Sequence, residues 1–481
     1  MGDALSTGVG QAVCFAAASV FSFFVPRVLG AGVYGEWMLY RGLGIFWLTL
    51  LLLGDRLVMS AFYLPCRERG EVDAAARVYS FLVALRMGLS IPFVVCMLGM
   101  WYRAGGMFHS ASDGLWLAVT FVARGTYLNM NTLMFGHRRM GRLAALEGMQ
   151  SVVLPLAVLG ACRSGRPEWI PAAAAGTDML QAALASCGAT WRREWHWRWP
   201  SAIIRRAMVR YILLVGMAST VTGALNQLLF YLMGCRGYAP ETIGRVALAM
   251  RCVWIAQTGL MALGAALLPA LAGIRQQDGE ARMVRWRNLV MRFGVALLLL
   301  LAGNLLWAGP RVAALIWGDE FRNIMPLIAA GLVATAGVWV AAQWSVPALL
   351  RQDGRVQLHA TLAYAVMLCG GLWAMPVDAS GWGALVAVGV ASLAMAVVAW
   401  GWARRDEEFA GRWVGRFVWP CALAIPLMWG VGRGGWGVWL VGFAVWNGLF
   451  TGALLLCGAI HWFEVRDLWS MFWMRRRNVV A

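Results

Sequence analysis

The chain has 481 residues, of which 61% are hydrophobic and only 13% are charged, and its formal net charge is +18. A soluble protein of this length cannot cover so much apolar surface with so few charges, so the composition predicts a polytopic membrane protein. The basic residues are all arginines in short loops between apolar runs. This placement favours contact with anionic lipids and argues against nucleic acid as a partner.

About fourteen apolar runs are long enough to cross a bilayer, because a membrane helix needs about 20 predominantly apolar residues. In chain order the runs lie near 8–28, 37–63, 78–101, 114–136, 143–162, 168–189, 208–234, 243–269, 290–309, 323–346, 357–375, 381–402, 416–432 and 435–459. The expected fold class is therefore an all-α polytopic membrane protein with about 14 transmembrane helices.

Arginines are concentrated in every second loop, which indicates the orientation of the chain. The alternate loops are short and hold about a third as many arginines. The positive-inside rule places the Arg-rich set and both termini in the cytoplasm. Two Trp- and Arg-rich segments, 191–200 and 461–477, are typical of chain that lies on anionic membrane lipid. The Arg-rich segments are 65–77, 137–142, 190–210, 274–292, 347–356, 403–416 and 461–481.

A weak internal repeat divides the chain. Gly35 and Gly244 open equivalent helices at a spacing of 209, and Arg41 and Arg251 are equivalent at a spacing of 210. Six helices per repeat is an even number, so the two repeats have the same orientation and form parallel lobes. The expected organisation is an N-terminal six-helix lobe (1–190), a cytoplasmic linker (191–206), a C-terminal six-helix lobe (207–402), two additional helices (403–460) and a cytoplasmic tail (461–481).

The opening turn and second helix carry a resemblance to a known family. The stretch "RVLGAGVYGEWMLYRGLGIFWLTLLLLGDRLVMSAFYL", followed by "RERGE", resembles the start of polysaccharide exporters of the MATE-like, or MOP, superfamily. The resemblance rests on Arg27, Leu29, Gly30, Tyr34, Gly35, Leu53 and Gly54. It is specific only over the first 75 residues. It implies two six-helix lobes around a central cavity, and a Wzx-type flippase that moves an undecaprenyl-diphosphate-linked oligosaccharide across the bacterial inner membrane, beside glycosyltransferases and a polymerase.

Polar residues inside the apolar runs are the candidates for binding such a cargo. Polar side chains in a bilayer face the bundle interior or a wet cavity, and the guanidinium fork of arginine suits phosphate. Arg124, Tyr127 and Asn131 follow a spacing of i, i+3, i+7 and form one stripe. The residues expected to line the cavity are Arg41, Arg86, Arg124, Tyr127, Asn131, Asn226, Gln227 and Arg251.

Internal ion pairs are the alternative interpretation of several arginines. Arg56 lies beside Asp55, and Arg86 or Arg124 can pair with Glu147 or Asp178. We expect no metal and no cofactor, because the Cys and His residues form no CxxC or zinc spacing. No GxxxxGK[ST] sequence is present, so the chain is not expected to be its own ATPase.

Two other functions remain open on the sequence. A drug/cation antiporter of the same superfamily needs an acidic cavity, whereas this interior is basic. A membrane glycosyltransferase or polymerase needs long outer loops with paired carboxylates for acid–base chemistry, whereas these loops stay near about a dozen residues.

Overall fold

The computed structural model describes residues 2–104, 108–137, 139–187, 199–350, 354–403, 447–448 and 450–452. Every regular element in these ranges is helical. The predicted fold class, an all-α polytopic membrane protein, is confirmed. The predicted helices at 416–432 and 435–459, the tail and most of the segment 191–200 lie outside the described residues, apart from a few positions. The predicted lobe boundaries stay a prediction.

Helices of the first half follow the predicted spans in order. A helix forms wherever an apolar run is long enough to satisfy its own backbone in lipid. The elements are α1 (Gly2–Leu51), α2 (Asp55–Val58), the π-helix η1 (Met59–Tyr63), α3 (Leu64–Glu68), α4 (Val72–Ala104), α5 (Ala111–Gly136), α6 (Met140–Arg163), the 3₁₀ turn η2 (Pro167–Trp169) and α7 (Ile170–Ser186).

The second half continues in the same way. Each of the twelve predicted spans between residues 8 and 402 overlaps a long helix or a run of consecutive shorter helices. The elements are α9 (Ala202–Tyr211), the π-helix η3 (Ile212–Gly216), α10 (Met217–Cys235), α11 (Pro240–Asp278), α12 (Glu280–Trp317), the 3₁₀ turn η4 (Asp319–Phe321), α13 (Ile324–Leu350), α14 (Arg355–Ala374) and α15 (Trp382–Ala403).

Glycines mark the places where the long elements change direction. Gly30 inside α1 has φ 71° and ψ 168°, so α1 consists of two helices joined at a turn and contains the first two predicted spans. Gly309 inside α12 has φ 67° and separates a short terminal helix in the same way. A positive φ of this kind is accessible to glycine without a Cβ penalty.

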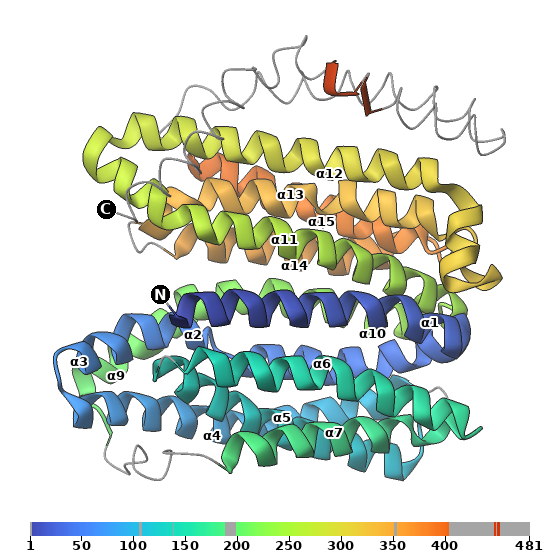
Figure 1. Cartoon of the computed structure of the whole chain (residues 1–481), viewed down its shortest axis with the longest axis horizontal. Coiled ribbons are helices and arrows are strands. Elements are labelled where there is room, and N and C mark those ends of the chain that lie inside the picture. The colour runs from blue at the N-terminus through green and yellow to red at the C-terminus, as the bar shows by residue number, and fades with distance from the viewer. Residues whose placement is uncertain are drawn as a thin grey trace.

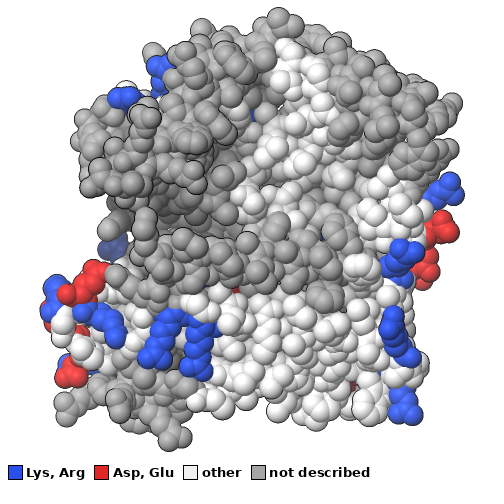
Figure 2. Space-filling model, viewed as in Figure 1, with Lys and Arg blue, Asp and Glu red and all other residues white. Residues whose placement is uncertain are grey.

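The helices run side by side along one direction, with α11 to α15 above and α4 to α7 below in Figure 1. Between them lies α1, which contacts α6, α10 and α11. We call the end of the bundle that holds Gly30 the outer end, and the end that holds α3, α9 and the start of α1 the inner end, following the predicted orientation. Charged side chains gather towards these two ends, with uncharged surface between them (Figure 2). Such a distribution is typical of a protein that crosses a bilayer.

Apolar side chains cover the flanks of the bundle. Met87, Ile91 and Val95 follow a four-residue spacing on α4 and are 58%, 73% and 66% exposed. A soluble protein would not expose such a stripe, whereas lipid covers it. Seven helices among the described residues are long and apolar enough to cross a membrane, or eight if the bent pair Ala202–Gly216 and Thr220–Cys235 is one span.

Two helices cross through glycine near the outer end. A Cβ on Gly35 would lie 1.9 Å from the carbonyl oxygen of Pro240, and a Cβ on Gly244 would lie 2.0 Å from that of Ala31. The backbones of α1 and α11 therefore touch here, and only glycine permits this distance. Gly35 and Gly244 are the pair that the sequence repeat aligns. The repeat itself stays a prediction.

Hydrogen bonds tie the Gly30 turn to the loop before α13. The backbone N–H of Ala31 donates to Glu320 Oε2 at 2.6 Å, and Arg27 Nη1 donates to the Leu315 carbonyl oxygen at 2.9 Å. Glu320 thereby caps the start of the second helix of α1, where a carboxylate is favoured by the helix dipole. The Gly30 turn is thus a structural joint at the outer end.

Candidate functional site

A buried carboxylate organises the polar contacts between α5, α6 and α7. Arg124 Nε lies 2.8 Å from Asp178 Oδ1, and Gln150 Nε2 donates to the same oxygen at 2.5 Å. Asp178 is only 4% exposed, whereas the Arg124 side chain remains 26% exposed. Burying a carboxylate is costly unless it is paired and hydrogen-bonded, and here both conditions are met.

The predicted stripe on α5 continues towards the inner end. Asn131 Nδ2 donates to Glu147 Oε1 at 3.2 Å and to the Tyr127 hydroxyl at 3.3 Å. Arg56 Nη2 lies 3.7 Å from Glu147 Oε1. Arg124, Tyr127 and Asn131 therefore share one face of α5. The ion pair between Arg124 and Asp178, one of those considered from the sequence, is present. Arg56, which neighbours Asp55 in the sequence, pairs with Glu147.

Arg41 reaches the same cluster from α1. Its guanidinium carbon lies 5.8 Å from the ring centroid of Trp37, on the same helix. The Arg41 charge is within electrostatic reach of Arg124, Arg251 and Asp178. Arg251 comes from α11, so the structure brings the two repeat-equivalent arginines together. We call Arg41, Arg124, Arg251 and Asp178 the central cluster.

Partners distinguish the arginines of the central cluster. Arg124 has a short ion pair with Asp178, whereas the side chain of Arg41 has no hydrogen bond or ion pair with any described residue. Arg41 is therefore a guanidinium inside the bundle that has no hydrogen-bonded counter-ion among the described residues. Such a charge is expensive in a bilayer and favours an anion beside it.

Arg86 has a different place from the one expected. It is 1% exposed and lies at the break between α1 and α2, where Leu53 and Gly54 have φ values of 54° and 66°. Its Nε and Nη2 donate to the carbonyl oxygens of Leu51 and Leu52 at 3.1 and 2.8 Å. The Leu52 carbonyl oxygen also accepts from the backbone N–H of Asp55 at 3.0 Å, so Arg86 adds a charged donor to the carbonyl oxygens at the broken end of α1.

Side chains complete the surroundings of Arg86. Arg86 Nη2 lies 3.3 Å from Asp55 Oδ2, and Arg86 Nη1 donates to Thr132 Oγ1 at 2.9 Å. Thr132 Oγ1 donates in turn to Asp55 Oδ2 at 2.9 Å. We call this group the break cluster. Because the hydrogen-bonding groups of Arg86 are engaged within the protein, we assign it a structural role in place of the predicted contact with cargo.

Asn226 and Gln227 lie on α10 and contact two different helices, α14 and α1. Asn226 Oδ1 accepts a hydrogen bond of 2.7 Å from the Tyr364 hydroxyl of α14. The backbone of Gln227 packs on α1, where a Cβ on Gly42 would lie 3.0 Å from the Gln227 carbonyl oxygen. The Gln227 side-chain oxygen is buried without a hydrogen-bond partner in the described part of the chain. The role of both residues in binding stays a prediction.

Further residues near these groups were not in the predicted set. The sequence analysis considers Asp178 and Glu147 only as possible ion-pair partners of arginine, whereas in the structure both carboxylates organise the polar contacts and Gln150 donates to Asp178. A second basic site, on α9, was read only as part of an Arg-rich loop. The amphipathic spacing of 202–213 is the signal that could have identified it. In the described ranges no group of three His, Cys, Asp or Glu side chains is placed to hold a metal ion.

Comparison with known proteins adds information on the fold only. No family model matches the sequence, and no curated protein is similar to it. Among solved structures, lipid II flippase MurJ in an inward closed conformation is similar with a TM-score of 0.67 and 9% identity, over 96% of this chain and 99% of that one. The chain therefore shares the fold of this flippase.

Two transporters of the MATE family support the same assignment. An inward-facing multidrug resistance MATE transporter of the MOP superfamily has a TM-score of 0.59 and 12% identity, over 83% of this chain and 98% of that one. A MATE in complex with MaL6 has a TM-score of 0.57 and 14% identity, over 83% and 95%. The first resemblance expected from the sequence, to the superfamily, is confirmed at the level of fold. The Wzx-type assignment remains a proposal.

Proposed function

We propose that this protein is a flippase that moves an undecaprenyl-diphosphate-linked oligosaccharide across the bacterial cytoplasmic membrane by alternating access, for polysaccharide export. The proposed orientation has both termini in the cytoplasm. The observation that carries the proposal is the central cluster, where Arg41 lies within electrostatic reach of Arg124 and Arg251 and the nearby carboxylate of Asp178 is already paired with Arg124.

The charge balance of the central cluster favours an anionic cargo. Asp178 already accepts from Arg124 and Gln150, so its capacity to neutralise Arg41 is limited. Like charges in a bundle interior repel unless an anion lies between them. A diphosphate offers several oxygens, and each guanidinium can donate two parallel hydrogen bonds to them. Arg41 and Arg251 are therefore proposed to bind the diphosphate, with Arg124 supporting them.

The sugar part of such a cargo needs neutral donors and acceptors. Tyr127 and Asn131 lie on the same face of α5 as Arg124, towards the inner end. Hydroxyl and amide groups are suited to sugar hydroxyls, because each can both donate and accept a hydrogen bond. We propose these two residues as sugar contacts, with Asn226 and Gln227 as further candidates on α10.

A drug/cation antiporter is the second candidate, because Glu147 is a partly exposed carboxylate. Its side chain is 34% exposed, and it accepts from Asn131 and pairs with Arg56. A cation would compete with Arg56 for it, and the nearby excess of arginine would repel that cation. The flippase is therefore the better supported of the two.

The test is complementation of an export-deficient bacterial strain. We expect Arg41→Ala and Arg251→Ala to abolish or sharply reduce glycan export at unchanged membrane levels, because a charged hydrogen bond is worth about 1.5–3 kcal/mol, roughly ten- to a hundredfold in affinity. Arg→Lys should rescue only in part, since lysine lacks the bidentate fork. Arg163→Ala, which removes an exposed arginine at the outer end, is the matched control.

Two results would contradict the proposal. Full export by both alanine variants would show that the arginines do not bind cargo. Efflux of a cationic dye that depends on Glu147, without any effect on glycan export, would favour the antiporter.

A further inference from the structure

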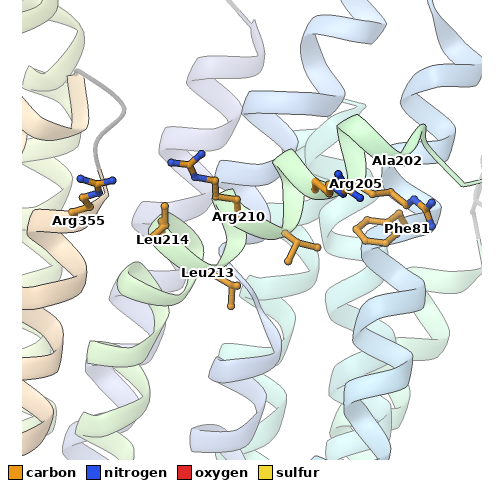
Figure 3. Close-up of a pocket in the computed structure, with 9 residues that line it drawn as sticks. Phe81, Ala202, Arg205, Arg210, Leu213, Leu214 and Arg355 are labelled. Atoms are coloured by element: carbon orange, nitrogen blue, oxygen red, sulfur yellow. The ribbon is translucent and has the colours of Figure 1, made fainter.

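A second basic site lies on α9, at the inner end and apart from the central cluster. A cavity of about 810 Å³ is lined there by four arginines and by apolar side chains. No Asp or Glu is among its lining residues. Figure 3 shows Arg210 and Arg355 at one level, with Leu213 and Leu214 below them in this view. We call this cavity the α9 pocket; it is lined by Phe81, Ala202, Arg205, Arg206, Val209, Arg210, Leu213, Leu214 and Arg355.

The sequence of α9 explains why charge and apolar surface share one face. At 3.6 residues per turn, the α9 pocket residues from Ala202 to Leu213 fall within an arc of about 140°. Met208 and Ile212, on the other face, are buried against the core. The π-helix η3 follows directly and contains Leu213 and Leu214, at a local irregularity of the kind frequent at functional sites.

Close packing brings α14 to the same place. A Cβ on Gly354 would lie 2.7 Å from the Leu214 carbonyl oxygen, so the start of α14 abuts η3. Arg355 is the first residue of α14 and therefore faces the α9 pocket together with the α9 arginines. Arginines from two elements distant in sequence converge on one cavity.

The arginines of α9 have capacity for an anion. Arg206 and Arg210 are exposed and have no hydrogen bond or ion pair with any described residue. Arg205 stacks on Trp199 at 5.7 Å, and its Nε is buried without a hydrogen-bond partner in the described ranges. Trp199 packs edge-on against Phe81 at 5.5 Å. Tryptophan beside arginine is typical of the membrane–water interface.

The walls of the α9 pocket identify the kind of anion. Val209 and Leu213 are 39% and 57% exposed, directly beside the exposed arginines. A small hydrophilic anion would not contact this apolar surface. The acyl chains of a phospholipid would contact it, and the phosphate would bind the guanidinium groups. Basic pockets between transmembrane helices on the cytoplasmic side are suited to lipid headgroups.

We propose that the α9 pocket binds the phosphate headgroup of an anionic phospholipid from the inner leaflet. This site is independent of the cargo site proposed above. Arg206 and Arg210 bind the phosphate, Arg355 adds a third positive charge, and Leu213 and Val209 contact the acyl chain. A bound lipid would hold α9 against α14 and the end of α4.

The experiment uses the purified full-length protein, delipidated in a non-ionic detergent, with lipid binding measured by native mass spectrometry. We expect phosphatidylglycerol to bind at least tenfold more tightly than phosphatidylcholine. The double variant Arg206→Ala/Arg210→Ala should weaken phosphatidylglycerol binding by roughly ten- to a hundredfold, as expected when charged hydrogen bonds are lost. Both residues are exposed, so the variant should fold.

The matched control is Arg163→Ala/Arg166→Ala, which removes two exposed arginines at the outer end and changes the net charge equally. Retained phosphatidylglycerol binding in this control supports the α9 pocket, and an equal loss would overturn it. Equal affinity for both lipids, or unchanged binding in the α9 variant, would also overturn it. A further titration with inorganic phosphate separates the sources: displacement of the lipid at equal concentration would show that the α9 pocket is a site for free phosphate.

Discussion

The break cluster and the central cluster both hold arginine inside the membrane, but they differ in how many hydrogen-bond partners the protein offers to each guanidinium. In the break cluster Arg86 is 1% exposed and donates to two carbonyl oxygens, to Thr132 and to Asp55. In the central cluster Asp178 pairs with Arg124, whereas Arg41 is half-buried and has no hydrogen bond or ion pair with a described residue. A saturated arginine stabilises the fold and has no donor left for cargo, whereas an unsaturated one costs stability and can bind an anion.

The largest effect is expected from Arg86→Ala. The variant leaves the buried carboxylate of Asp55 without its ion pair and removes the Arg86 donors to the Leu51 and Leu52 carbonyl oxygens, so the free energy of unfolding should fall by about 3–5 kcal/mol. Titration with SDS in mixed micelles measures this change. The double variant Arg86→Met/Asp55→Asn should lose much less, because it removes both charges. If Arg86→Ala alone were as stable as the wild type, the break cluster would have no structural role.

A smaller loss is expected from Arg124→Ala. Asp178 would keep Gln150 but lose its ion pair, and a buried group deprived of one partner costs about 1–3 kcal/mol. The same unfolding assay measures it, with the exposed Arg163→Ala as the control. If the loss matched that of Arg86→Ala, the two clusters would be structurally equivalent and the contrast between them would fail.

Asp378 lies outside the membrane spans, and its contribution to stability is a reference for those of the carboxylates in the two clusters. Burial raises the pKa of Asp378, but hydrogen bonds from the Ser380 hydroxyl and from the N–H groups of Gly383 and Trp382 outweigh burial, so the pKa lies below its ordinary value. These bonds cap α15, and Asp378→Ala should cost about 0.5–2 kcal/mol at neutral pH.

The pH dependence of this reference follows from the direction of the shift. A lowered folded-state pKa means that stabilisation is fully present above the ordinary aspartate pKa and is lost as the pH falls through the lowered value. The difference in the free energy of unfolding between the wild type and Asp378→Ala should therefore shrink only in strong acid. A difference that vanished already near neutral pH would contradict the assignment of Asp378 as an ionised cap.

The smallest effect on stability is expected from Arg41→Ala. The variant removes a charge that repels Arg124 and Arg251, so the free energy of unfolding should change by less than about 0.5 kcal/mol or rise slightly. Export, by contrast, should fall sharply. Parallel measurement of unfolding and export on Arg41→Ala and Arg86→Ala gives the sharpest form of the comparison. A large destabilisation by Arg41→Ala would show that Arg41, like Arg86, has a structural role.

The sequence predicts the helices well because apolar length and helix formation are coupled in lipid. The residues of the site are harder to predict. Arg41 and Arg86 look alike in the sequence, since each is a single arginine in an apolar run. What separates them is the break at Leu53 and Gly54, which frees carbonyls for Arg86, and this break depends on contact with Gly216 of another helix. The predicted repeat pairs Arg41 with Arg251, and the two charges lie within electrostatic reach of each other in the structure; the two-lobe organisation itself stays a prediction.

The glycine crossing at the outer end carries a consequence for the origin of the chain. Ala31 and Gly35 of α1 touch Pro240 and Gly244 of α11, and each member of one pair lies 209 residues from a member of the other. In a two-fold symmetric dimer, a patch contacts its own copy in this reciprocal way. A half-length ancestor could thus have made this contact between two identical subunits. Fusion of two such copies would allow the halves to diverge in charge, and in this chain Arg124 and Asp178 both lie in the first half.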